Sequence, residues 1–97
     1  VYRELKEKLE KLEKSSEFYV EQGAAYMAQG RDEDAEELWK KALAIDPSSV
    51  SASILLGGLY EKNGNFIKAS AEYKKVIELR PDMEGIKKSL EEILKNG

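Results

Sequence analysis

Most side chains of this 97-residue chain that could do chemistry are carboxylates and ammonium groups. Many of them come as sequence neighbours: Glu36-Glu37, Lys40-Lys41, Lys74-Lys75, Lys87-Lys88 and Glu91-Glu92. Catalytic pairs must converge on one point, but adjacent residues of a helix diverge. The chain has no histidine and no cysteine, which excludes imidazole and thiol chemistry, disulfides and most transition-metal sites. We therefore predict that the protein is not an enzyme and has no catalytic residues.

The run Asp32-Glu33-Asp34 is the strongest hint of a metal site. No glycine-turned calcium loop follows it, whereas negative charge at the start of a helix is favoured by the helix dipole. Gly57-Gly58 likewise lacks the pattern of a phosphate-binding loop. We expect no metal and no cofactor.

Composition narrows the class of partner and the domain count. A net charge of −3 argues against a nucleic-acid partner, and no apolar run approaches the roughly 18 residues that membrane insertion needs. The length suits one domain. Because the chain begins at Val1 rather than at Met, we expect a truncated N-terminus. The missing signal peptide therefore says little about the compartment. Cytoplasm is the default location, and a domain cut from an envelope or periplasmic protein fits as well.

Spacing of apolar residues and breakers predicts six helices and no strand. Proline or glycine ends several of them, and Ser48 or Ser49 caps the fourth. The predicted helices cover about residues 2–14, 16–29, 32–45, 49–63, 66–79 and 83–95.

A 34-residue repeat organises these helices. Seven residues recur at this offset: Gly23, Tyr26, Gly30, Ala35, Lys40, Lys41 and Pro47 return as Gly57, Tyr60, Gly64, Ala69, Lys74, Lys75 and Pro81. Such self-similarity is typical of stacked repeats, in which each unit leaves an apolar face for its neighbour to cover.

These residues resemble the tetratricopeptide repeat, whose motif is W-x2-L-G-x2-Y, then A-x3-F, then P. The first repeat supplies Tyr19, Gln22, Gly23, Tyr26, Ala35, Trp39 and Pro47, and the second supplies Ser53, Leu56, Gly57, Tyr60, Ala69, Tyr73 and Pro81. Gln22 departs from the usual leucine, and Ser53 departs from the usual large aromatic residue.

Glycine in mid-helix costs about 1 kcal/mol against alanine, so Gly23 and Gly57 need a reason. We predict close approach of the paired helix, with the small residues Ala35 and Ala69 opposite. The aromatic residues would fill the space beside these contacts: Tyr26, Trp39, Tyr60 and Tyr73.

The resemblance implies an all-α stack of helical hairpins in one domain. We divide it into an N-terminal helix (1–15), two repeats (16–49 and 50–83) and a C-terminal capping helix (84–97). The capping helix should cover the last repeat with one apolar face: Ile86, Leu90, Ile93 and Leu94.

Tetratricopeptide proteins bind protein partners in a concave groove lined by the first helix of each pair. Carried onto this sequence, the predicted partner-binding groove is Val20, Ala24, Met27, Ile54, Leu55, Gly58, Glu61 and Lys62. An uncovered apolar patch marks a binding surface. The alternative is that this patch is core, covered by the sixth helix or by the N-terminal helix.

The N-terminal helix carries an apolar stripe of its own: Tyr2, Leu5, Leu9 and Leu12. Packing against the first repeat as a cap is one interpretation. Self-association is the other, and it makes the chain a homo-oligomerisation element rather than a binder of other proteins.

Some family members hold acidic chaperone tails in a carboxylate clamp of lysine, asparagine and arginine. Here Val20, Ala24 and Leu55 occupy three clamp positions, and Gly85 and Ser89 occupy the other two. None is a cation or an amide, so we predict that the groove does not bind such tails.

Overall fold

The computed structural model describes residues 1–13 and 15–96, with side chains for residues 1–7 and 15–95. This part of the chain holds no strand, and its helices are α1 (Tyr2–Glu13), α2 (Ser16–Ala28), α3 (Asp32–Ile45), α4 (Val50–Lys62), α5 (Phe66–Leu79) and α6 (Glu84–Asn96). The all-α prediction is confirmed, and the predicted bounds hold to within one or two residues.

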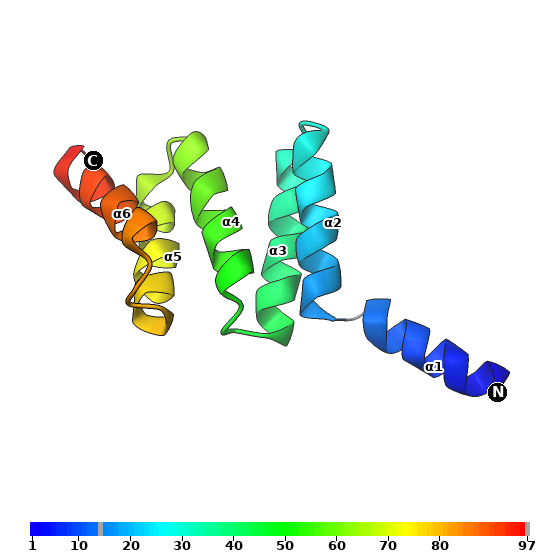
Figure 1. The fold of residues 1–97 in the computed structure, drawn as a ribbon. Helices are drawn as coiled ribbons and strands as arrows, with labels where there is room; N and C mark the ends of the chain where they lie inside the picture. Colours follow the sequence, from blue (N-terminus) through cyan, green and yellow to red (C-terminus); the bar gives the residue numbers. More distant parts are fainter. Residues whose placement is uncertain (14, 97) are drawn as a thin grey trace. The chain divides into compact units, whose positions relative to one another are not determined.

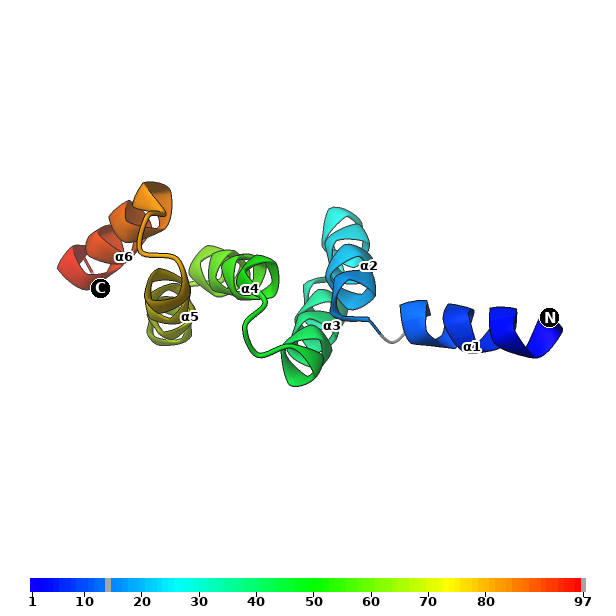
Figure 2. The same ribbon diagram turned by 60° about the horizontal axis from the view of Figure 1, so that its bottom comes forward.

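The helices fall into two compact units, Val1–Pro47 and Ser48–Gly97. In the first unit α2 packs along α3 (Figure 1). In the second unit α4 packs along α5, and α5 packs against α6 (Figure 2). The predicted helix pairs are therefore the hairpins of the structure.

Both hairpins turn in the same way. Gly30 and Gly64 have the same positive φ of 79°, a left-handed conformation that glycine adopts without a Cβ penalty. In each turn the backbone N–H of the residue after the glycine donates to a tyrosine carbonyl. Arg31 donates to Tyr26 at 2.9 Å, and Asn65 donates to Tyr60 at 2.7 Å. The repeated glycines thus end the first helix of each pair.

Serine side chains cap the first helix of each pair. The hydroxyl of Ser49 accepts from the N–H of Ala52 at 3.3 Å, so of the two predicted candidates, Ser48 and Ser49, it is Ser49 that caps α4. The hydroxyl of Ser15 accepts from the N–H of Phe18 at 3.1 Å and caps α2. Each cap satisfies one of the unpaired N–H groups at a helix start.

Trp39 packs against the bare backbone of Gly23. A Cβ built on Gly23 would lie 2.4 Å from Trp39 Nε1, closer than any side chain tolerates. The indole is fully buried, and its Nε1–H donates to the carbonyl of Val20 at 3.0 Å. This ring holds α3 against α2.

Tyr73 repeats the arrangement in the second hairpin. A Cβ on Gly57 would lie 2.5 Å from Tyr73 Cε1, and the tyrosine is only 4% exposed. The prediction of close helix approach at these glycines is supported. The prediction that Ala35 and Ala69 lie opposite these glycines was wrong, however. Both alanines are fully buried, but the atoms that face each glycine belong to the aromatic ring.

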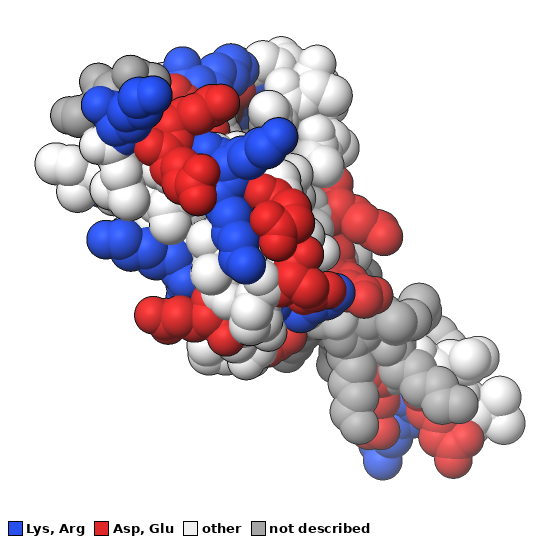
Figure 3. All heavy atoms as spheres, turned by 60° about the vertical axis from the view of Figure 1, so that its left-hand side comes forward, with Lys and Arg blue, Asp and Glu red and all other residues white. Residues whose placement is uncertain are grey.

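The predicted covering face of α6 needs one correction. Ile93 is buried and Ile86 and Leu90 are half-buried, whereas Leu94 is 61% exposed. Residues 86, 90 and 93 share one face at helical spacing, and residue 94 lies at the edge of that face, about 100° from residue 93 and about 40° from residue 90. Acidic and basic side chains intermingle on the second unit in Figure 3, as a solvent-facing end helix requires.

The apolar stripe of α1 is open to solvent where its side chains are described. Tyr2 is 80% exposed and Leu5 is 56% exposed, so these two residues do not pack on the first repeat as a cap would. The side chains of Leu9 and Leu12 lie outside the described residues.

Ser53 is fully buried in α4, and its hydroxyl oxygen has no hydrogen-bond partner among the described residues. It occupies the position at which the repeat motif has a large aromatic residue. An unpaired buried hydroxyl costs about 1–3 kcal/mol of stability. Among its described residues, the second hairpin therefore carries one buried hydroxyl without a hydrogen bond.

Substitution of adjacent glycines tests the ring contact. Gly57→Ala should lower the free energy of unfolding, because overpacking costs about 1–3 kcal/mol and exceeds the helix-propensity gain of about 1 kcal/mol. At Gly58 the nearest atom to a Cβ is Tyr73 Oη at 3.9 Å, an ordinary contact, so Gly58→Ala should be stabilising. Urea unfolding measures both, and equal effects would contradict the contact.

Removing the Ser53 hydroxyl should stabilise the protein. Ser53→Ala eliminates an unpaired buried polar group and should raise the free energy of unfolding by about 1 kcal/mol more than Ser51→Ala. Ser51 is the matched control because it is exposed on the same helix, so its replacement reports helix propensity alone. Thermal unfolding compares the two, and a destabilised Ser53→Ala protein would mean that the hydroxyl is paired.

Candidate partner-binding surface

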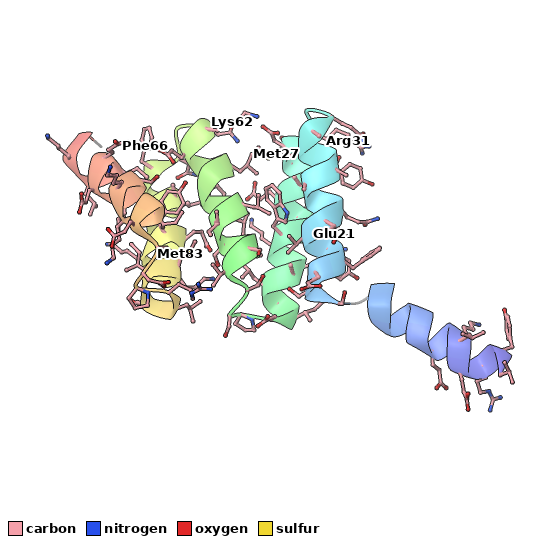
Figure 4. The ribbon with its side chains drawn as sticks, viewed as in Figure 1. Glu21, Met27, Arg31, Lys62, Phe66 and Met83 are labelled. Carbon is pink, nitrogen blue, oxygen red and sulfur yellow. The ribbon has the colours of Figure 1, made fainter. Side chains whose placement is uncertain are left out.

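The predicted residues of α2 share one face of the helix. Val20, Ala24 and Met27 are spaced four and three apart, as one stripe of a helix requires. Ala24 is exposed, and Val20 and Met27 are half-buried. The helix-pairing contact uses Gly23 instead. This apolar face, to which Met27 belongs (labelled in Figure 4), therefore retains solvent-accessible surface.

The predicted residues of α4 repeat this face 34 positions later. Ile54, Gly58 and Glu61 match Val20, Ala24 and Met27, and all three are half-buried. Leu55 is half-buried and Lys62 is exposed, and together they form the neighbouring stripe of α4. We call the two matched surfaces the α2 face and the α4 face.

Glu61 is held by the second helix of its own hairpin. The hydroxyl of Tyr73 donates to Glu61 Oε1 at 2.8 Å. Burial, then the hydrogen bond to Glu61 and the charge of that carboxylate, raise the pKa of Tyr73 well above its ordinary value. The phenol donates this hydrogen bond and orients the carboxylate at the end of the α4 face.

The predicted groove leaves out two α2 residues whose repeat counterparts on α4 it includes. Glu21 and Ala28 are the repeat counterparts of Leu55 and Lys62, and both are exposed. Glu21 and Lys62 are labelled in Figure 4. The 34-residue offset was the signal that could have found them.

The described contacts identify what the flanking helices pack against. The partner of α6 in the second unit is α5, and Tyr2 and Leu5 of α1 are exposed. These contacts therefore do not show that α6 or α1, the two covers predicted from the sequence, lies over the apolar faces. That the α2 face and the α4 face bind a partner remains a prediction.

The described residues hold no cluster of three or more acidic side chains that could bind a metal ion. The helices of this part of the chain are also too short and too polar to cross a membrane.

Two family models match this chain. A family model described as "TPR repeat" matches residues 23–64, and one described as "Tetratricopeptide repeat" matches residues 50–83. The chain belongs to the tetratricopeptide repeat family. The resemblance inferred from the glycine and aromatic spacing is confirmed.

Two individual proteins are similar to this tetratricopeptide protein. The mouse (Mus musculus) protein named "Protein O-mannosyl-transferase TMTC1" is 28% identical over 75 residues, which cover 77% of this chain and 8% of the mouse protein. The solved structure "Arabidopsis OM64 TPR domain" matches with a TM-score of 0.79 at 23% identity, over 87% of this chain and 69% of that one. The chain thus spans a small part of the curated relative, and the solved structure supports the fold alone.

Proposed function

We propose that this tetratricopeptide protein is a non-catalytic module that binds a peptide or helix of another protein through the α2 face and the α4 face. Tetratricopeptide repeats generally mediate protein–protein interactions. The observation that carries the proposal is that a partly exposed face with a β-branched residue and then a small residue recurs in both hairpins, and it ends in Met27 in the first and in Glu61 in the second. Matched faces suit a partner that contacts successive repeats in the same way.

The chemistry of the two faces indicates the kind of partner. Val20, Ala24, Met27 and Ile54 are apolar or small, so they favour an apolar side chain over a carboxylate. The absence of histidine and cysteine supports a non-catalytic role. The transferase activity in the name of the mouse relative belongs to that protein, of which this chain matches 8%.

Homo-oligomerisation is the second candidate, and the exposure of Tyr2 and Leu5 favours it. An exposed apolar stripe on a helix associates with a similar stripe on a second copy. Molar mass measured by light scattering over a concentration series separates the candidates: a monomer at all concentrations supports the binding module, and a dimer supports assembly.

Charge added to the two faces should block binding and leave the fold intact. Ala24→Glu with Gly58→Glu places one carboxylate at the same repeat position of each hairpin. Ala24 is exposed, and a Cβ at Gly58 meets only Tyr73 Oη, at 3.9 Å. A glutamate at position 58 also lies one turn from Glu61, so the total cost to stability should stay within about 1 kcal/mol. An apolar partner would have to desolvate both carboxylates, so capture of protein partners from a lysate should be lost.

Two controls complete this test. Ala24→Gln with Gly58→Gln has the same size without charge, and Ala44→Glu with Ala71→Glu adds two charges to exposed positions of α3 and α5. Both controls should retain partners. Loss of partners in the α3 and α5 control would contradict the proposed surface, and unfolding of the Ala24 and Gly58 variant would mean that the faces are core. Loss of self-association alone would favour assembly.

A further inference from the structure

The two hairpin turns have the same backbone conformation but carry side chains of opposite kind, acidic in the first and apolar in the second. Gly30 and Gly64 have the same φ, and the hydrogen bonds around them match. The second helix then begins with Asp32-Glu33-Asp34 in the first hairpin and with Phe66-Ile67-Lys68 in the second. Since the backbone is the same, the difference lies in what the side chains offer to solvent.

The first turn of α5 lacks the favourable interaction between acidic side chains and the helix dipole. Acidic residues in the first turn of a helix are stabilised by the helix dipole. The first turn of α3 has three of them and the first turn of α5 has none. In their place Phe66 is 44% exposed and Ile67 is 85% exposed. They line an open hollow of about 490 Å³ together with residues 63–65, and residues 30–34 line one of about 370 Å³ in the first hairpin. Phe66 is labelled in Figure 4.

The charged side chains nearest to this hollow in the sequence are Lys62 and Lys68, and Glu61 and Glu72 lie beyond them. No acidic residue occurs between Lys62 and Ala71. Lys68 lies in the first turn of α5, with its Nζ 5.5 Å from the centre of the Tyr60 ring. The positive end of the α5 dipole adds to this charge. An exposed apolar pair beside positive charge complements a segment that is both apolar and acidic.

We propose that the α4–α5 turn, residues 63–68, is a second binding surface, separate from the α2 and α4 faces. It binds a protein segment in which acidic residues flank a large apolar side chain. The apolar side chain packs on Phe66 and Ile67, and a carboxylate lies near Lys68 and the start of α5. The matched turn of the first hairpin carries Asp32, Glu33 and Asp34, so it repels the same segment.

Amide shifts of the full ¹⁵N-labelled chain test this proposal. The probe is an acetylated, amidated decapeptide of alternating aspartate with leucine or phenylalanine, and its control has lysine in place of every aspartate. The acidic peptide should shift the amides of residues 63–68 and leave those of residues 30–34 unchanged. The lysine peptide should shift neither turn. Shifts in both turns, or with both peptides, would overturn the proposal.

Variants at Ile67 keep the test decisive. Ile67→Glu installs the residue of the first hairpin, and it should weaken peptide binding by at least about tenfold through lost apolar contact and like charge. The melting temperature should not fall, because Ile67 is exposed and a carboxylate suits the helix start. Ile67→Ala removes the apolar contact without charge and should also weaken binding. The control Ala71→Glu, one turn further along α5, should bind more tightly than Ile67→Glu.

Membrane contact is the competing use of an apolar, basic turn. Vesicles of phosphatidylcholine and phosphatidylserine, added to the same labelled chain, should leave the amides of residues 63–68 unbroadened. Broadening by vesicles without any shift by the acidic peptide would overturn the proposal and assign the turn to lipid. Unchanged binding of the peptide by Ile67→Glu would overturn it as well.

Discussion

Each hairpin of this protein depends on an aromatic ring that lies on a bare glycine backbone. The buried indole of Trp39 covers Gly23, and the Tyr73 ring covers Gly57, at distances that leave no room for a Cβ. The ring is the largest buried surface available to the second helix, and glycine is the residue that lets it approach. The helix-propensity cost of a mid-helix glycine is thus offset by aromatic packing.

That contact also decides which surfaces remain for partners. Because the ring uses the glycine face of the first helix, the neighbouring face with Ala24 or Gly58 stays accessible. In the second hairpin the same ring carries a hydroxyl that holds Glu61 at 2.8 Å, so the packing residue also positions a surface carboxylate. Residues that are free of the contact, such as Ile67, can differ between repeats without a change of backbone.

The helices and their pairing could be predicted from the sequence because they follow from local signals: apolar spacing, glycine and proline breaks, and one 34-residue offset. Details that depend on the exact direction of a side chain could not. Leu94 was placed on the buried face although it lies at the exposed edge of that face. The complete burial of Ser53 and the exposure of Ile67 depend on neighbours that apolar spacing does not specify. The α2 and α4 faces were predicted as a pattern, and their role in binding rests on experiment.

The central claim is that Gly57 is required because of the Tyr73 ring, and a double-mutant cycle measures this directly. Gly57→Ala is made in the natural chain and in a Tyr73→Ala background, and the free energy of unfolding is determined for all four proteins. The account predicts that Gly57→Ala destabilises the natural chain but is neutral or stabilising once the ring is gone, with a coupling energy of at least about 1 kcal/mol. The same cost in both backgrounds would contradict it.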